Sequence, residues 1–310
     1  MATPRTPDQA GTLAPLLHTF RTTRGGTTES GVLETGVPGV TFFWNEQPVP
    51  RAPLLYDAGV VIVAQGHKVG YLGERRFIYD ADTCLVLGVP VPFECEVEAS
   101  PQAPLLGIRI DIDITALHSL VACLRGRMPV EDGSGGATHA GVEPVPMDVP
   151  LLNASKRLID SLGDPLDREV LGPAAVNEII YRVLRSAQGH VLHALTQHHT
   201  PYASVARALT RIHKDYRLSL PIEELAKESA MSVSTFHRAF KQTTGESPLQ
   251  YLKKIRLLKA KGLLVFEGAR VEEAAFKVGY VSASQFSREF KSYFNVPPSL
   301  AQSLPYNDAP

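Results

Sequence analysis

One six-residue pattern occurs twice near the end of this chain, and it limits the possible folds more than any other feature. Phe236-His237-Arg238-Ala239-Phe240-Lys241 recurs as Phe286-Ser287-Arg288-Glu289-Phe290-Lys291, displaced by 50 residues. Pro248 matches Pro298 at the same offset. A shared pattern at one fixed spacing indicates a duplicated supersecondary unit.

Each copy is typical of two helices joined by a tight turn. In the first copy Pro221 stands where a helix would begin, and Ser232 or Ser234 can cap the next helix, expected from Val233 to about Thr243. The side of this helix opposite the phenylalanines carries a polar stripe at i, i+3, i+4 and i+7 in both copies: Ser234, His237, Arg238 and Lys241, then Ser284, Ser287, Arg288 and Lys291. The pattern predicts helix-turn-helix units at about 221–244 and 271–294, whose second helices enter the major groove of DNA.

The residue types on this stripe suit that task. Arg238 and Arg288 can each offer a fork of donors to guanine O6 and N7, or hold a phosphate. Lysines near the helix ends suit phosphates, and hydroxyls can bond to base edges or to the backbone. The residues concerned are Lys241 and Lys291, and Thr235, Ser284 and Ser287.

Between the two units, Leu249–Phe266 is expected to form one helix. Eighteen residues at a rise of ~1.5 Å span roughly 27 Å. Such a rod could hold two recognition helices about one DNA turn (~34 Å) apart, so that one chain reads two neighbouring major-groove segments.

The charge distribution agrees with a polyanion partner for the second part of the chain. Residues 1–203 carry 15 Lys and Arg against 22 Asp and Glu, so this part is acidic. Residues 204–310 carry the remaining 16 Lys and Arg against 10 Asp and Glu, so this part is basic. An acidic part fused to a basic one indicates that the two parts do different things.

The first part predicts a β-rich domain followed by helices. Seven short segments between Val40 and Asp113 have strand composition, separated by turns and not by helices, which is typical of a sandwich or barrel. They are Thr41–Trp44, Val60–Ala64, Val69–Leu72, Arg76–Tyr79, Cys84–Gly88, Phe93–Val97 and Leu105–Asp111. In the last of them, isoleucines alternate with Arg109 and Asp111, so we expect one face of this strand to be wet.

Helices are expected at Ile114–Leu124, Val149–Leu162, Pro173–Leu195 and Tyr202–Tyr216, with a mobile connection at Gly126–Pro150. The third helix has an apolar stripe that suits either internal packing or a dimer contact. It consists of Ile179, Ile180, Val183, Leu184, Ala187 and Val191.

The last hundred residues resemble the DNA-binding domain of the AraC/XylS family of bacterial transcription regulators, over about residues 204–303. The resemblance is carried by Leu225-Ala226, Met231-Ser232, the two repeated hexapeptides, Gly245-Glu246-Ser247-Pro248, Ala275-Phe276-Lys277-Val278-Gly279-Tyr280 and Asn295-Val296-Pro297-Pro298. Ala230 and Asn295 depart from it, because the family usually has glycine at the first of these places and often at the second. The resemblance places base-facing residues at Ser234, His237, Arg238, Ala283, Ser284, Ser287 and Arg288.

The first part resembles the N-terminal domain of one AraC subfamily, through Pro53–Asp57, Val63–Lys68, Gly73 and Tyr79-Asp80. The resemblance implies an α+β chain with a cupin-like barrel (about 40–113) and trailing helices (about 149–199) in an effector-binding and dimerisation domain of residues 1–199. Residues 200–310 would then form the DNA-binding domain.

Together these features predict a one-component transcription regulator of the bacterial cytoplasm, a homodimer on nucleoid DNA that responds to a small-molecule effector, without catalytic activity, cofactor or metal. RNA polymerase would be a partner if it is an activator. No run of eighteen apolar residues and no apolar signal core at Met1–Pro7 is present, so no membrane contact is expected.

Other interpretations of the first part remain open. A cupin enzyme needs about three metal ligands, whereas His67 is the one histidine between Val40 and Asp113. The histidines of the group His190, His193, His198 and His199 suit a solvated helix end better than a metal. Gly133-Ser134-Gly135-Gly136 is not a nucleophile elbow.

The three cysteines, Cys84, Cys95 and Cys123, form no CxxC pair and fit a reducing compartment. Cys84 and Cys95 could sense electrophiles or oxidants, or could be buried hydrophobes. Phe43, Trp44 and Tyr71, with these two cysteines, could line an effector cavity in the barrel. A protein that binds a ligand or an acidic partner, without contacting DNA, is the alternative from a different class.

Overall fold

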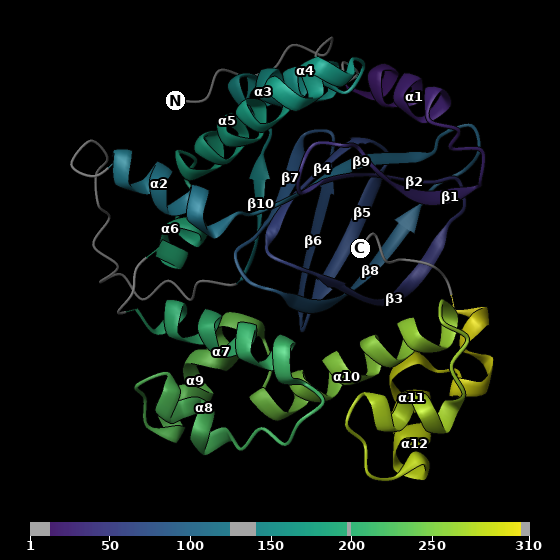
Figure 1. Ribbon diagram of the computed structural model, residues 1–310, viewed down its shortest axis with the longest axis vertical. Helices are drawn as coiled ribbons and strands as arrows, with labels where there is room; N and C mark the ends of the chain where they lie inside the picture. Colours follow the sequence, from purple (N-terminus) through teal and green to yellow (C-terminus); the bar gives the residue numbers. More distant parts are fainter. Residues whose placement is uncertain (1–12, 125–140, 197–199, 305–310) are drawn as a thin grey trace.

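The computed structural model describes residues 13–124, 141–196 and 200–304. An antiparallel sheet curls into a half-barrel, helices cover its outer face, and a helical part follows on the other side (Figure 1). The predicted α+β class, with a β-domain first and paired helix-turn-helix units last, is confirmed.

The strands follow one another in the order β1-β2-β9-β4-β7-β6-β5-β8-β3, with β10 paired to β7. Their bounds are β1 (Ser30–Glu34), β2 (Val40–Asn45), β3 (Val49–Tyr56), β4 (Gly59–Gln65), β5 (His67–Leu72), β6 (Arg75–Asp80), β7 (Thr83–Leu87), β8 (Val91–Glu98), β9 (Leu105–Asp111) and β10 (Val142–Pro146). All seven predicted strands are present. The prediction missed β1, β3 and β10, and both β3 and β10 contain prolines, which sheets tolerate at their margins.

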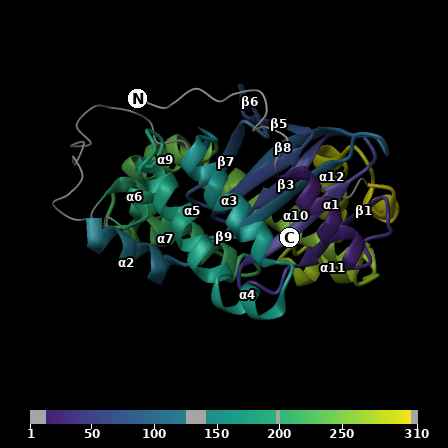
Figure 2. The same cartoon turned by 90° about the horizontal axis from the view of Figure 1, so that it is seen from above.

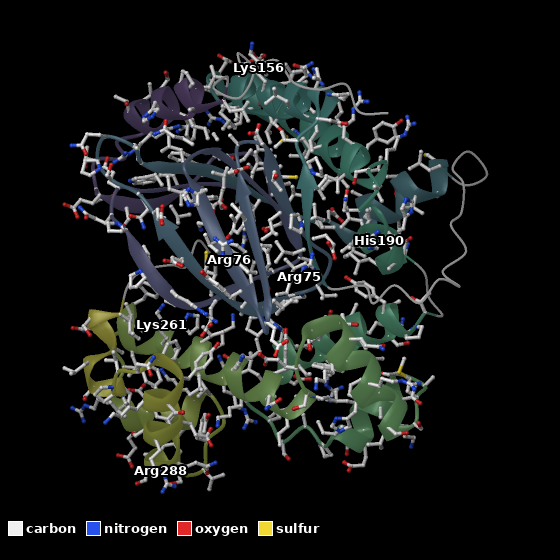
Figure 3. All side chains as sticks on the ribbon, turned by 180° about the vertical axis from the view of Figure 1, so that it is seen from behind. Arg75, Arg76, Lys156, His190, Lys261 and Arg288 are labelled. Carbon is white, nitrogen blue, oxygen red and sulfur yellow. The ribbon has the colours of Figure 1, made fainter. Side chains whose placement is uncertain are left out.

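Strand β10 corrects the prediction of a mobile connection at Gly126–Pro150. Its backbone pairs with β7 from Val142 to Pro146. Arg75 of β6 fastens it further, donating to the carbonyl of Val142 at 3.1 Å and to the carboxylate of Glu143 at 2.8 Å (Figure 3). Residues 126–140 of that connection lie outside the described part of the chain.

The curl of the sheet encloses one of its faces. The Lys68 ammonium on β5 lies 4.7 Å from the centre of the Phe43 ring on β2, although four strands separate β2 from β5 in the sheet. The same face contributes Tyr56, Tyr79 and Phe93 to one buried core. This face is therefore the barrel interior.

Helices α1 (Ala14–Thr23), α3 (Val149–Ser161) and α5 (Gly172–Leu184) pack on the outer face of β2, β4 and β9. Four residues of the predicted stripe belong to α5 and lie in this core, namely Ile179, Ile180, Val183 and Leu184. Val191 is buried in the next helix and Ala187 is exposed between the two. The part of the stripe in α5 is thus internal packing, and its alternative interpretation as a dimer contact is wrong.

The predicted helix Pro173–Leu195 is in fact two helices. α5 ends at Leu184 and α6 spans His190–Thr196, with a turn between them. A Cβ at Gly189 in this turn would lie 2.2 Å from the carbonyl oxygen of Leu184. Two more helices complete this part of the chain, α2 (Ile114–Leu124) as predicted and α4 (Pro165–Val170), which the sequence did not indicate.

The helical part after residue 200 contains the two predicted helix-turn-helix units. Its elements are α7 (Pro201–Asp215), α8 (Ile222–Glu228), α9 (Val233–Thr244), α10 (Pro248–Val265), α11 (Val271–Lys277), α12 (Ala283–Phe294) and a 3-10 helix at Pro298–Ser303. Seen from above, α9 lies toward one end of the molecule and α11 and α12 toward the other, with α10 between them (Figure 2).

Helix α10 belongs to two separate cores. Tyr251, Leu252 and Ile255 in its first half pack in the same core as the barrel interior and α9. Leu257 and Leu264 in its second half pack with α11 and α12. The first helix-turn-helix unit therefore shares its core with the barrel, whereas the second has a core of its own.

The two departures from the family pattern both adopt left-handed backbone. Ala230 has φ +55° and Asn295 has φ +59°, and the corresponding positions of the other copy hold glycine, Gly279 at φ +92° and Gly245 at φ +80°. Asparagine tolerates this conformation, whereas alanine is strained in it by roughly 1–2 kcal/mol.

Ala230→Gly should therefore raise the free energy of unfolding by about 1 kcal/mol, because it relieves this strain. Gly279→Ala should lower the free energy of unfolding, since the added Cβ would lie 2.4 Å from the carbonyl oxygen of Arg217 as well as requiring positive φ. Urea unfolding of the two variants measures both changes. A loss of stability in Ala230→Gly would contradict the strain argument.

Candidate nucleic-acid interface

Helix α9 separates an apolar face from a polar one, as predicted for a recognition helix. Phe236 and Phe240 are fully buried and pack against each other, with ring centres 5.5 Å apart. The side chains on the opposite face are exposed, namely Ser234, His237, Arg238 and Lys241. The helix thus presents its hydrogen-bonding groups to solvent from a rigid apolar base.

Helix α12 repeats this arrangement with small differences. Phe286, Phe290 and Phe294 are buried. On the opposite face Ser284, Arg288 and Lys291 are exposed, while Ala283 and Ser287 are half-buried. Arg288 lies on the side of the helical part that faces away from the sheet (Figure 3). The barrel therefore does not cover this helix at Arg288.

A serine caps each recognition helix, and this fixes the start of the helix. The Ser232 hydroxyl accepts from the backbone N–H of Thr235, and that of Ser282 from the backbone N–H of Gln285, both at 3.3 Å. In the first unit Ser232 is the cap and the alternative, Ser234, lies on the exposed face. Thr235 is half-buried, and its hydroxyl accepts from Ser232 at 2.9 Å, so it is less available than the other predicted contacts.

The acidic residue in α12 is held by neighbouring side chains. Glu289 accepts from the hydroxyl of Tyr280 at 2.8 Å and from Gln285 at 3.2 Å, and Lys253 of α10 lies 3.3 Å away. Burial raises the pKa of Glu289, but these partners outweigh burial and the pKa lies below its usual value. The carboxylate thus stays ionised, and its charge is balanced by Lys253 and not directed at a phosphate.

Most of the basic residues of α10 serve the fold, whereas Lys259 is exposed. Lys254 pairs with Glu246, and Arg256 donates to the carbonyls of Tyr216 and Leu218 at 2.7 and 2.8 Å. Lys261 is 3% exposed and lies on the side of the helical part that faces the sheet (Figure 3). The basic character of this helix therefore overstates the charge that it could offer to DNA.

The structure divides the five predicted effector residues. Phe43 and Cys95 face the barrel interior. Trp44 and Cys84 lie on the outer face, Trp44 stacked on Phe42. Tyr71 is half-buried on the outer side, under Arg51 and bonded to Glu96 at 2.9 Å. The prediction that Trp44, Tyr71 and Cys84 line the interior is wrong, because strand alternation alone does not tell which face is enclosed.

The two buried cysteines cannot act as a pair. β7 and β8 are separated by β6 and β5, and the thiols lie on opposite faces of the sheet. Burial raises the pKa of Cys84 to about 12, and it also raises that of Cys95. Oxidation and electrophile addition require a thiolate, so both thiols are poorly suited to sensing.

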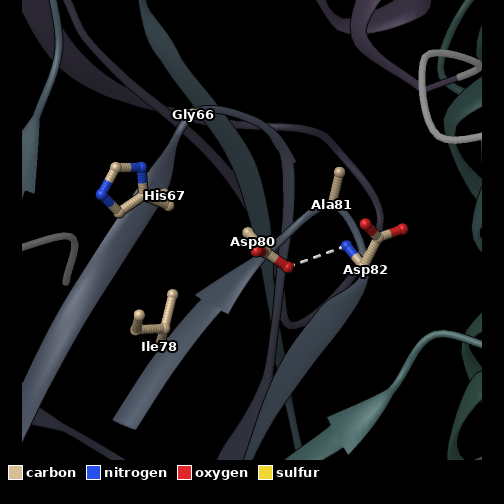
Figure 4. A pocket seen from close by; sticks show the side chains of 6 residues that line it. All are labelled: Gly66, His67, Ile78, Asp80, Ala81 and Asp82. Carbon is tan, nitrogen blue, oxygen red and sulfur yellow. Dashed lines mark hydrogen bonds between the residues drawn. The ribbon is translucent and has the colours of Figure 1, made fainter. Parts of the chain in front are cut away.

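An open surface pocket lies where the turns before β5 and β7 meet (Figure 4). Asp80 accepts from the backbone N–H of Asp82 at 2.9 Å, and the ring of His67 lies 3.6 Å from Glu98. Within the described residues, no group of three or more His, Cys, Asp or Glu side chains could hold a metal ion. His198 and His199 lie outside the described residues.

A hydrogen-bonded chain joins α7 and α10 to the barrel. Tyr251 donates to the carbonyl of Pro90, between β7 and β8, at 2.7 Å. Since the single hydroxyl proton is used there, the ring of His213 donates to Tyr251 through Nε2, also at 2.7 Å. Burial lowers the pKa of His213 to about 4, Asp57 opposes this, and Lys259 lowers it further. The histidine is therefore neutral when the two parts of the chain are docked.

Acid should weaken this contact. An unfolded histidine titrates near pH 6.5, so the stability contributed by neutral His213 is complete above about pH 6.5 and is lost as the pH falls toward 4. We expect a loss of about 2 kcal/mol between pH 7.5 and 5. His213→Gln, which does not titrate, should flatten this dependence in urea unfolding. Parallel curves for the two proteins would count against the role of His213.

The burial of two cations of the β-domain was not predicted from the sequence. Lys68 is 4% exposed and Arg109 is 6% exposed, and both face the barrel interior. The expectation that Arg109 lies on a wet face is wrong, because that face is the enclosed one. The sequence contained no indication of this, because the alternation of Arg109 with Ile108 and Ile110 does not tell which face the neighbouring strands, β2 and β4, enclose.

Comparisons with known proteins agree with this architecture. A family model described as AraC-type transcriptional regulator N-terminus matches residues 36–191, about half of the chain, and a helix-turn-helix domain model matches residues 225–302. The chain is 30% identical to an AraC-like transcription regulator from Streptomyces lividans over 161 residues, 50% of this chain and 53% of that protein. It is 38% identical to the transcriptional activator RhaS from Klebsiella pneumoniae over 76 residues, 24% of this chain and 27% of RhaS.

The chain thus spans about half, or less, of the length of these curated relatives. Among solved structures, apo ToxT from Vibrio cholerae superposes with a TM-score of 0.58 at 12% identity, over 85% of this chain and 97% of ToxT. ToxT bound to an unsaturated fatty acid superposes with a TM-score of 0.56 at 12% identity, over 91% of this chain and 98% of ToxT. These two structures establish the fold alone. Since the family model covers half of the chain, the protein belongs to the family of AraC-type transcriptional regulators.

Proposed function

We propose that this protein is a sequence-specific DNA-binding regulator of transcription, in which each chain reads two adjacent major-groove segments. One observation carries the proposal. Two capped recognition helices expose matching polar faces, and a single helix, α10, is packed into the core of each unit. A rigid linker of this kind fixes the spacing of the two helices, as binding to neighbouring groove segments requires.

The proposed roles follow the chemistry of each side chain. Arg238 and Arg288 read guanine or hold a phosphate, and Lys241 and Lys291 hold phosphates. Ser234, His237, Ser284 and Ser287 contact base edges or backbone, Thr235 contacts the backbone, and Ala283 contacts at most a thymine methyl. We further propose that residues 200–310 form the DNA-binding domain.

Residues 1–199 would bind a small effector inside the barrel and mediate homodimerisation. Support for the first role comes from the enclosed interior, with Phe43 and Cys95 on its wall. A dimer would use a surface other than the α5 stripe, and sedimentation of the full chain measures whether it is a monomer or a dimer.

None of the described helices is long and apolar enough to cross a membrane. We place this non-catalytic protein in the bacterial cytoplasm, with RNA polymerase as a partner if it activates.

Selection of bound sequences from a random duplex library tests the proposal. The full-length protein should enrich a motif of two short elements about one helical turn apart. Salt-sensitive binding without any enriched motif would contradict sequence-specific reading by the free protein. The slope of affinity against salt on arbitrary DNA separates a DNA-binding protein from one that docks an acidic protein partner.

A further inference from the structure

The interior of the barrel holds two positive charges that the proposed DNA contacts do not use. Lys68 donates to the hydroxyl of Tyr56 at 2.8 Å and lies over the Phe43 ring. Arg109 pairs through Nη2 with Asp111 at 2.8 Å, and the Asp111 side chain is 45% exposed while that of Arg109 is 8% exposed. The Arg109 guanidinium is thus inside the barrel and its carboxylate partner is at the rim.

The pairing of Arg109 is incomplete. Its Nε and Nη1 are enclosed by protein and have no hydrogen-bond partner among the described residues. The hydroxyl of Thr41 is also enclosed and has no hydrogen-bond partner among the described residues, and Thr41 stands directly opposite Arg109 in the β2–β9 pair. Three polar groups from two neighbouring strands therefore lie together on the interior face without partners.

The fold gives no reason for this group. The residue facing Arg109 from its other neighbour, β4, is the fully buried Val61, and Phe43 follows Thr41 on the same face. Enclosing unpaired donors costs stability, and an apolar side chain of similar size usually packs better than a buried ion. The guanidinium of Arg109 and the hydroxyl of Thr41 can both donate hydrogen bonds to the oxygens of a carboxylate. Because these donors cost stability without a partner, their presence points to a bound ligand that supplies one.

We propose that the barrel interior binds a small carboxylic acid, with the carboxylate held by Arg109 and Thr41 and the apolar part against Phe43. The proposal rests on the effector-binding role given above and names the chemical class of the effector. The Lys68 ammonium, which lies over Phe43 from β5, adds a second positive charge on the interior face, where the low polarity strengthens attraction for an anion.

The position of this site connects it to the docked DNA-binding part. Burial raises the pKa of Asp111, Arg109 opposes this, and Asp57 in the β3–β4 turn raises it further. Asp57 also acts on the residues that join α7 and α10 to the barrel: burial lowers the pKa of His213 and Asp57 partly offsets this, while burial raises the pKa of Tyr251 and Asp57 adds to it. An anion at Arg109 would change the charge that these groups experience.

Thermal unfolding of the full chain without ligand gives the first test. Arg109→Met and Thr41→Val should raise the midpoint, because each removes enclosed donors without partners. Thr35→Val is the matched control: its hydroxyl is also buried but donates to the carbonyl of Val40 at 2.8 Å, so its loss should lower the midpoint. A lowered midpoint in both Arg109→Met and Thr41→Val would mean that the group serves the fold, and would overturn the proposal.

Ligand binding gives the second test, with phenylacetate and butanoate as probes and their primary amides as matched neutral molecules. At about 10 mM, ten times a millimolar Kd, a carboxylate should raise the midpoint of the wild-type chain by about 3 °C. The amides should not, and Arg109→Met should abolish the shift. Equal shifts from the amides, a full shift in Arg109→Met, or no shift from either carboxylate overturns the proposal.

The two proposals fail separately. An enriched DNA motif without a carboxylate shift overturns the anion site and leaves the regulator intact. A carboxylate shift that needs Arg109, without any enriched motif, supports the anion site and contradicts the DNA-binding function.

Discussion

Phe286→Ala should lower the free energy of unfolding of the second helix-turn-helix unit by about 3–5 kcal/mol. Phe286 is fully buried, with its ring centre 5.3 Å from that of Tyr280 and 5.5 Å from that of Phe290. Removing the ring leaves a cavity that the surrounding helices can fill only in part. The core concerned consists of the end of α10 with α11 and α12, so the damage should stay within this unit.

Phe236→Ala is the matched variant, because Phe236 occupies the same position of the repeat and is equally buried. Its core, however, is continuous with the barrel interior and includes Tyr56 and Phe93. Hydrogen exchange measured by mass spectrometry should show faster exchange in α11 and α12 for Phe286→Ala. For Phe236→Ala it should show faster exchange in α9 and also in β3 and β8. Equal acceleration of the barrel strands in both variants would contradict the division into two cores.

Replacing both Arg238 and Arg288 by alanine should remove most of the preference for the selected DNA sequence. Each arginine that reads a guanine contributes about 1–3 kcal/mol of discrimination. The two side chains lie on different helix-turn-helix units, so their effects should add to about 2–6 kcal/mol. The double variant should then bind the selected duplex and a random duplex with similar affinity, as measured by fluorescence anisotropy.

Two further variants separate the roles. Lys241→Ala should weaken binding to both duplexes equally and reduce the salt dependence by about one phosphate contact. Arg185→Ala, which changes an exposed arginine just after α5, should leave both affinities unchanged. Equal losses on selected and random DNA for Arg238→Ala and Lys241→Ala would contradict the assignment of base reading to arginine.

The helix-turn-helix units were predictable because their structure is local. Recognition helix α9 begins and ends within one residue of its predicted bounds, and α12 ends where the second unit was predicted to end, since serine caps and a phenylalanine spacing of four residues act within one helix. The left-handed positions at Ala230 and Asn295 also match the places where the repeat departs from glycine.

The positions of most barrel strands were predictable, whereas which face of each strand lies inside the barrel was not. Period-two alternation assigned Phe43 and Trp44 to opposite sides of β2, but it did not say which side would be enclosed. Strands β3 and β10 were missed because their pairing partners, β8 and β7, and not their own composition, hold them in the sheet.

By itself the sequence determined the duplicated unit, the α+β order of the two parts and the polar faces of the recognition helices, because each depends on residues close together in the chain. The tertiary structure alone decided that Arg109 and Lys68 lie in a closed interior, that the α5 stripe is core, and that α10 joins two cores. Each of these depends on packing between elements that are not adjacent in the chain, such as β2 with β5, α5 with the outer face of the sheet, and α10 with the barrel, and local periodicity carries no information about such contacts.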